Sequence, residues 1–167
     1  QQVVRYTTNH DVNGSDGTPL ERFGGLPGSI SAFIAASLMK GVPMIYNGQE
    51  VGTPIRLTFP FTSADINWTL NPDLKVTYKK ILSFRNSSTA VRGGTLVSYS
   101  NANILAFTKE LGAEKVCILS NVRNSSINFN LPGALSGTSW TDVMTGTPVS
   151  LGTTVSLPAY GYLLLKN

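Results

Sequence analysis

The chain has 167 residues and a hydrophobic fraction of 41%, which allow one or two ordinary globular domains and argue against intrinsic disorder. Its formal net charge of +4 comes from scattered basic residues, without a basic stripe that alternates with aromatics, so we expect no nucleic-acid partner. No apolar stretch reaches the roughly 20 residues that a membrane span requires, and we expect no span.

The first predicted element is a short β-branched strand over residues 2–8, which ends at the polar cluster of residues 9–11. A loop rich in Gly, Ser, Asp and Pro follows. Ser29 is then placed to cap a helix that runs to about residue 40, and residues 42–46 form an apolar run typical of a buried strand. This order predicts a βαβ unit with parallel strands.

The helix over residues 29–40 has its apolar side chains at helical spacing, on a face made by Ile30, Phe33, Ile34 and Leu38 with the small Ser37. A second helix is predicted from Asn71 and Pro72, which supply an N-cap and a proline at the first helical position, to about residue 86.

From about residue 93 the chain consists of short alternating runs separated by turn residues, which predict an antiparallel β-sandwich. The runs cover residues 95–99, 103–108, 115–119, 126–131, 138–143, 149–157 and 160–166. The lone cysteine, Cys117, lies in an apolar run, so we expect a buried thiol and no intramolecular disulfide. The predicted domains are 1–90 and 91–167.

The two strands of the βαβ unit look buried on both sides, yet two strands and a helix cannot cover their own sheet. We therefore expect the first domain to be the end of a longer βα-repeat protein, with the rest of the sheet supplied by upstream sequence.

One polar cluster has the residue types of a sugar-binding or catalytic site. His10, the only histidine, stands between Asn9 and Asp11 at a predicted strand end, where side chains of a parallel β/α barrel point into the active-site mouth.

Two motifs in chain order resemble the alpha-amylase family of retaining glycoside hydrolases. Residues 6–11, Tyr-Thr-Thr-Asn-His-Asp, are similar to the motif at the end of that family's seventh barrel strand. Residues 41–52, with Gly-Val-Pro-Met-Ile-Tyr followed by Gly-Gln-Glu, are similar to its eighth-strand pattern. The resemblance implies an α/β fold followed by an all-β fold: strands seven and eight of a (β/α)8 barrel, then a Greek-key-like sandwich.

The resemblance also implies the roles of individual residues. Asp11 matches the family aspartate that stabilises the transition state, while His10 and Asn9 match the sugar-binding histidine and the residue that supports the pair. The family's nucleophile and acid/base carboxylates lie on strands four and five, and those motifs are missing here, so we expect this chain to be inert by itself. Glu50 matches a structural or subsite-shaping position of the strand-eight motif.

For partners, the resemblance implies an α-1,4-glucan or oligosaccharide substrate and the missing N-terminal part of the chain's own barrel. It implies no cofactor for this chain, and it leaves calcium open for a longer parent. Residues 11–22 only partly match a calcium-loop template, because the glycine stands at position 17 and the twelfth residue is Arg22. The glucan substrate, together with a charged fraction of only 13%, favours a secreted, periplasmic or cell-surface location.

Two other functions stay open. The β-domain could be a non-catalytic carbohydrate-binding module, in which Trp140, Tyr99 and Tyr160 would form an exposed platform, or a purely structural module. Of these two we expect the structural role, because Tyr160 and Tyr162 share an apolar face with Leu164. A parent of the same family could also transglycosylate or isomerise sugars. A second aromatic group, Trp68 with Phe59 and Phe61, is open to sugar stacking or to packing.

Overall fold

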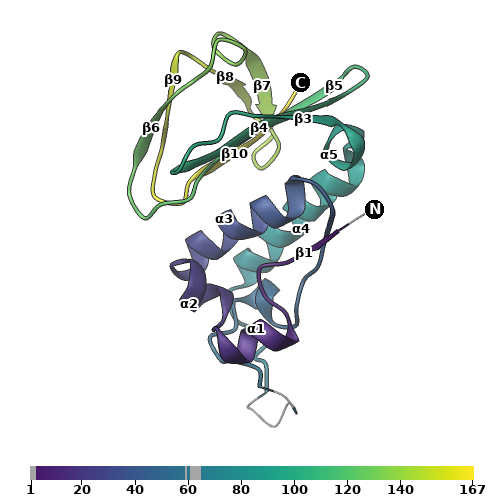
Figure 1. Ribbon diagram of the computed structural model, residues 1–167, viewed down its shortest axis with the longest axis vertical. Helices are drawn as coiled ribbons and strands as arrows, with labels where there is room; N and C mark the ends of the chain where they lie inside the picture. Colours follow the sequence, from purple (N-terminus) through teal and green to yellow (C-terminus); the bar gives the residue numbers. More distant parts are fainter. Residues whose placement is uncertain (1–2, 59, 61–64) are drawn as a thin grey trace. The chain divides into compact units, whose positions relative to one another are not determined.

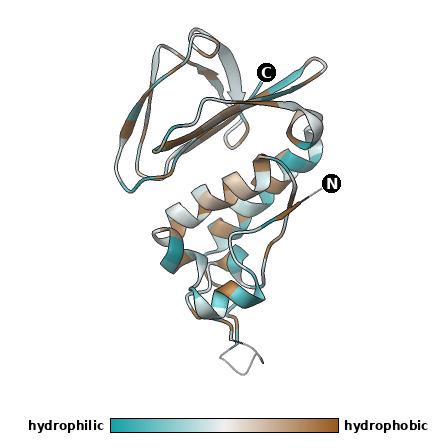
Figure 2. Cartoon of the chain, in the orientation of Figure 1, coloured by the Kyte–Doolittle hydropathy of each residue, from teal (hydrophilic) through white to brown (hydrophobic). Residues whose placement is uncertain are grey.

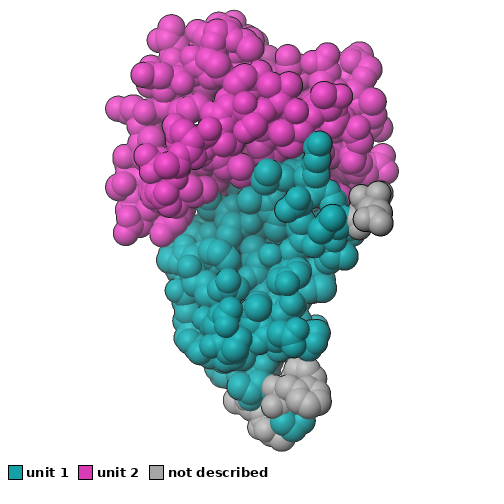
Figure 3. Space-filling view, viewed as in Figure 1, with its two compact units in different colours: residues 1–82 teal, residues 83–167 magenta. Residues whose placement is uncertain are grey.

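The computed structural model describes residues 3–58, 60 and 65–167, and the chain forms two compact units, residues 1–82 and 83–167 (Figures 1 and 3). Helix α4 (Pro72–Ser87) begins in the first unit and ends in the second. The predicted domain boundary between residues 90 and 91 stays a prediction.

The first unit is mainly helical. Its elements are β1 (Val4–Arg5), α1 (His10–Ser15), α2 (Pro19–Phe23), α3 (Gly25–Leu38), β2 (Val42–Pro43), the 3-10 turn η1 (Gln49–Val51) and the start of α4. β1 pairs in parallel with β2, with Val4 opposite Val42, as the βαβ prediction requires. Both strands are much shorter than predicted.

The segment predicted as a loop between strand and helix contains two short helices. Thr18 starts α2 through a capping box with Glu21, and Pro19 occupies the first helical position. The helix α3 begins at Gly25, so the prediction that Ser29 caps it is wrong. Ser29 instead lies inside the first turns, where its Oγ donates to the carbonyl of Leu26 at 2.7 Å.

The sequence pattern is typical of strands buried on both sides, but the described residues of this chain do not cover β1 and β2, which agrees with the expectation that the chain alone cannot cover them. Val4 is 55% exposed and Val42 is 41% exposed. The two strands nevertheless approach closely at Gly41, which has a φ of +99°. A Cβ atom there would lie 2.3 Å from the carbonyl oxygen of Val3, so only glycine fits this position.

The first unit has its own apolar core between α3 and α4. The ring of Phe33 stacks on that of Tyr78 with centroids 4.2 Å apart. Ile34, Leu38 and Ile81 are fully buried in the same unit. The helical faces predicted from apolar spacing are confirmed here, because these residues belong to the stripes that the sequence placed inward.

The second unit is an antiparallel β-domain preceded by a short helix. Its elements are α5 (Thr89–Gly93), β3 (Thr95–Ser98), β4 (Ile104–Leu111), β5 (Glu114–Asn121), β6 (Ile127–Asn130), β7 (Ser139–Asp142), β8 (Pro148–Ser150), β9 (Thr154–Leu157) and β10 (Tyr162–Lys166). One sheet has the order β3-β4-β5-β10-β7-β8, and β6 pairs with β9 in a second. All these pairs are antiparallel, as predicted.

The predicted strand over residues 149–157 proves to be two strands, β8 and β9, separated by residues 151–153. The predicted strand over residues 160–166 starts only at Tyr162. Tyr160 belongs to the turn before it and has a φ of +54°, a conformation that does not continue a strand.

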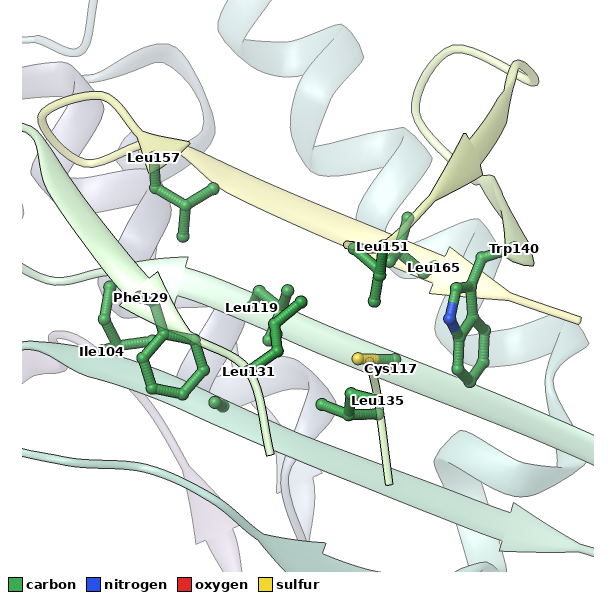
Figure 4. Close-up of a cluster of buried hydrophobic side chains, with 11 residues drawn as sticks. Ile104, Cys117, Leu119, Phe129, Leu131, Leu135, Trp140, Leu151, Leu157 and Leu165 are labelled. Carbon is green, nitrogen blue, oxygen red and sulfur yellow. The ribbon is translucent and has the colours of Figure 1, made fainter. Parts of the chain in front are cut away.

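An apolar core fills the space between the two sheets. Phe129 and Leu131 lie over the central strands of the larger sheet, which contribute Leu119 and Leu165 (Figure 4). The hydropathy colouring of Figure 2 shows apolar residues along these strands. Cys117 is a free, fully buried thiol of this core, as predicted, and burial raises its pKa to about 12.

The helix α5 was not predicted, and two charged side chains of the β4–β5 hairpin hold its ends. At its N-terminus, the Glu114 carboxylate accepts hydrogen bonds from the backbone N–H of Thr89 at 2.9 Å and of Ala90 at 3.1 Å. Near its C-terminus, the buried Lys109 ammonium donates to the carbonyl of Val91. Both charges have the sign that the helix dipole favours.

The backbone after α5 also lies very close to the backbone of β4, at Gly94. Gly94 ends the helix, and a Cβ atom at this position would lie 2.5 Å from the Ala90 oxygen and 2.8 Å from the Glu110 oxygen. The helix and β4 could not lie this close with a larger residue. Across the described part of the chain, no helix is long and apolar enough to cross a membrane.

Candidate functional site

The predicted site lies where β1 gives way to α1. Asn9 has an extended backbone and is the N-cap of α1, and its Oδ1 accepts hydrogen bonds from the backbone N–H of Asp11 at 3.0 Å and of Val12 at 2.9 Å. This capping bond satisfies two backbone donors that a helix start leaves unpaired. Asn9 therefore fixes the backbone that carries the other two predicted residues.

His10 and Asp11 are neighbours in space as well as in sequence, at the exposed first turn of α1. His10 Nε2 lies 3.4 Å from Asp11 Oδ1, and the two side chains are 65% and 77% exposed. An imidazole and a carboxylate side by side offer donors and acceptors that match the vicinal hydroxyls of a sugar. The structure brings all three predicted site residues together, and their roles in sugar binding stay predictions.

A buried amide lies beneath this turn and was missed in the site prediction. Asn13 is 2% exposed, its Nδ2 donates to Thr8 Oγ1 at 3.2 Å, and its Oδ1 accepts the backbone N–H of Leu57 at 2.7 Å. Asn13 thus connects α1 with the end of β1 and with a segment far along the chain. The partner at Leu57 carries no sequence signal, because a backbone N–H belongs to almost any residue.

An ion pair stands beside α1. Arg56 Nε contacts both carboxylate oxygens of Glu21 at 3.1 Å, and Glu21 also accepts the backbone N–H of Thr18 at 2.6 Å. The hydrogen bond from Arg56 lowers the pKa of Glu21, and Glu21 raises the pKa of Arg56. Arg56 Nη1 further donates to the carbonyl of Ser15 at 3.3 Å.

A small pocket adjoins Asn13. It is lined by Asn13, Pro19, Leu20, Asn47, Gly48, Gln49, Gly52 and Thr53. On its floor, Gln49 Nε2 donates to the hydroxyl of Tyr78 at 3.1 Å. Burial, with a smaller contribution from the charge of Glu50, raises the pKa of Tyr78 to about 12, so this phenol stays protonated.

Glu50, the other carboxylate considered in the sequence, is partly buried. Its Oε2 is buried and has no hydrogen-bond partner among the described residues. The same holds for Thr7 Oγ1 at the end of β1. Buried polar atoms of proteins are almost always paired, so these two mark places where a partner is expected.

Two further candidate groups are the partial calcium-loop match and the aromatic group around Trp68. Among the described residues, no cluster of three or more His, Cys, Asp or Glu side chains with metal-ligating geometry occurs. Trp68 is 51% exposed, while Phe59 and Phe61 lie outside the described residues.

The carbohydrate-binding alternative for the β-domain requires an exposed aromatic platform, and Trp140 is not exposed. This side chain is 7% exposed, belongs to the core, and its Nε1 donates to Thr138 Oγ1 at 2.7 Å. Tyr99 packs partly buried against the same core.

Comparison with known proteins finds one matching family model and several solved structures of similar fold. Residues 95–164 match the family model of the maltogenic amylase C-terminal domain. A comparison with curated proteins finds no match.

Solved structures with this fold include an Anoxybacillus alpha-amylase (TM-score 0.76, 16% identity) and the Geobacillus thermoleovorans alpha-amylase complexed with acarbose (TM-score 0.78, 15% identity). Each match covers 99% of this chain but only 38% of the other. A maltogenic amylase from S. marinus matches 96% of this chain and 22% of its own, with a TM-score of 0.68 and 19% identity. The chain therefore spans well under half the length of these proteins, and the likeness concerns their fold.

Proposed function

We propose that the chain is the C-terminal part of an alpha-amylase-type glycoside hydrolase that acts on α-1,4-linked glucans. The match of residues 95–164 to the family model of the maltogenic amylase C-terminal domain supports this proposal. In this proposal β1 and β2 are the seventh and eighth strands of a (β/α)8 barrel. The enzyme would use a retaining mechanism with a covalent glycosyl intermediate.

The observation that carries the proposal is the placement of Asn9, His10 and Asp11 together in the segment that follows β1, a strand paired in parallel with β2. In parallel β/α barrels, the active site lies at this end of the strands. A β-domain that serves only as a binding or structural module would not require the exposed carboxylate of Asp11 and imidazole of His10 next to β1. The fold likeness over nearly the whole chain supports the same assignment.

Exposed apolar strand residues support the missing barrel wall. Val3, Val4, Tyr6 and Val42 are all more than 40% exposed, although they flank or form the parallel pair. Large exposed apolar groups gathered on one element mark a surface that another part of a protein covers. Neighbouring barrel strands would cover these side chains, and they would also offer partners to the unpaired Thr7 Oγ1 and Glu50 Oε2.

Within such an enzyme the residues of this chain would bind and orient the sugar. The Asp11 carboxylate would accept hydrogen bonds from sugar hydroxyls and favour the positive charge that develops at the anomeric carbon. His10 would donate to a hydroxyl of the same ring. Attack on the anomeric carbon and protonation of the leaving oxygen would fall to two carboxylates whose motifs this sequence does not contain, so the chain alone would bind sugar without cleaving it.

The test is a titration of the chain with maltotriose, followed through the ring signals of His10 by NMR, which are unambiguous because the chain has one histidine. We expect saturable shifts at millimolar sugar, with cellotriose, its β-linked counterpart, giving at least about five-fold weaker binding, or roughly 1 kcal/mol. Asp11→Asn should weaken maltotriose binding, while Asp73→Asn, on α4, should not. Equal responses to both sugars, or none, would refute the proposal.

A further inference from the structure

Residues 56–58 lie along α1 and contact residues 13–15 of that helix. Arg56 donates to the carbonyl of Ser15, and the backbone N–H of Leu57 donates to Asn13. Between these two bonds, a Cβ atom added at Gly14 would lie 3.5 Å from the Cα of Thr58. The 56–58 segment therefore lies along residues 13–15 of α1, although the two are more than 40 positions apart in sequence.

The segment is itself held in place from outside α1. Arg56 makes a two-oxygen contact with Glu21, whose carboxylate is in turn fixed by the backbone N–H of Thr18 at the start of α2. A guanidinium bound by both carboxylate oxygens has a defined orientation, in contrast to a single-point ion pair. Arg56 therefore connects α2 with the last turn of α1.

The helix α1 needs such support because it is weak by itself. It has six residues and contains both Asn13 and Gly14, which are poor helix formers. Isolated helices of this length do not persist in water. Its hydrogen bonds to the 56–58 segment and to Thr8 therefore decide whether its first turn, which carries His10 and Asp11, has one conformation.

We propose that the 56–58 segment positions the Asn9–Asp11 turn, and that Asn13 and Arg56 are positioning residues for glucan binding by His10 and Asp11. This inference rests on the proposed function. Asn13 acts from beneath the turn, because its two bonds join the turn to Thr8 and to Leu57. Arg56 acts from the far end of the helix. A turn that is ordered before the sugar arrives binds it without a further loss of conformational freedom.

The experiment compares Asn13→Ala and Arg56→Gln with two controls in the full 167-residue chain. Asn124→Ala removes an exposed amide of the β-domain, and Asn13→Asp keeps an oxygen that can accept the N–H of Leu57. Amide hydrogen exchange is measured at Val12 and Asp16 without sugar, and maltotriose affinity is measured from the ring signals of His10.

We expect exchange in α1 to be at least ten-fold faster in Asn13→Ala, and three-fold or more in Arg56→Gln, with unchanged rates in the β-domain. Maltotriose affinity should fall at least five-fold in Asn13→Ala and recover at least in part in Asn13→Asp, which is a rescue that general destabilisation would not give. Asn124→Ala should match the parent chain in both measurements.

Unchanged exchange in α1 would overturn the inference, and so would faster exchange with undiminished maltotriose affinity. If the parent chain does not respond to maltotriose at all, the proposed function fails. In that event the exchange rates still decide whether the 56–58 segment holds the turn.

Discussion

The two units of the chain differ in how completely they bury their own strands. In the β-domain, the central strands β4 and β5 are buried over most of their length, and residues such as Leu119 have no exposed surface. In the first unit, β1 and β2 are two residues long and leave Val4 and Val42 largely exposed. The β-domain thus buries its own central strands, whereas the parallel pair leaves apolar side chains exposed to solvent.

The largest expected difference between the two units comes from shortening one apolar strand residue in each of them, Leu119 in the β-domain and Val4 in the first unit. Leu119→Ala removes a fully buried side chain between the two sheets and should destabilise the chain by about 3 kcal/mol. Val4→Ala, at an exposed strand position, should change stability by no more than about 0.5 kcal/mol. Thermal unfolding followed by circular dichroism checks both. A large loss in Val4→Ala would show that β1 is already packed in its final environment.

A second test concerns the close approach of α5 to β4. Gly94→Ala would place a Cβ atom 2.5 Å from the Ala90 oxygen and 2.8 Å from the Glu110 oxygen, both of which are backbone atoms. We expect a loss of about 2 kcal/mol, in the range for overpacking. Urea denaturation measures it, with Gly133→Ala as the control, because a Cβ at Gly133 meets nothing within 4 Å. An equal loss of stability in both variants would contradict the close packing of the α5 end against β4.

A third test uses pH on the charge that holds the start of α5. Hydrogen bonds from Ser88 and Thr89, then from the backbone of this turn, lower the pKa of Glu114 from 4.5 to about 2. A lowered folded-state pKa means that the carboxylate stabilises the fold above pH 4.5 and that this contribution is lost between pH 4.5 and about 2. Glu114→Gln should therefore cost about 1 kcal/mol at neutral pH and progressively less in acid. Parallel pH dependences for the two proteins would refute this capping role.

The smallest expected effect is a gain in α1. Gly14→Ala adds a Cβ at ordinary contact distance from Thr58 and replaces a poor helix former, so stability should rise by about 0.5 kcal/mol. Faster amide exchange at Asp16 in this variant, in place of slower exchange, would show that the 56–58 segment lies closer to α1 than described.

Sequence reasoning recovered the β-domain well because its strands are short runs separated by turn residues, and strands such as β6 and β7 alternate between buried and more exposed residues. It failed for α5 because Thr89–Gly93 is too short for a periodic signal and depends on Glu114 and Lys109, which lie far along the chain. The three candidate site residues were chosen from their types and order. Asn13 and Arg56 were not assigned to the site, since their importance comes from contacts with distant segments.

The alternative of an exposed aromatic platform does not hold at Trp140, for a related reason. An alternating strand pattern shows which residues share a face, but it does not show which face meets solvent. Trp140 lies on a strand whose alternate residues are buried, and it proved to be on the inner side.

The central claim is that this chain carries sugar-binding residues of an amylase-type site without the two carboxylates that perform the cleavage. Its most direct test is the release of reducing ends from soluble starch by the purified 167-residue chain. We predict no release above that of an Asp11→Asn control prepared in the same way. Sustained hydrolysis by the chain that Asp11→Asn abolishes would contradict the claim.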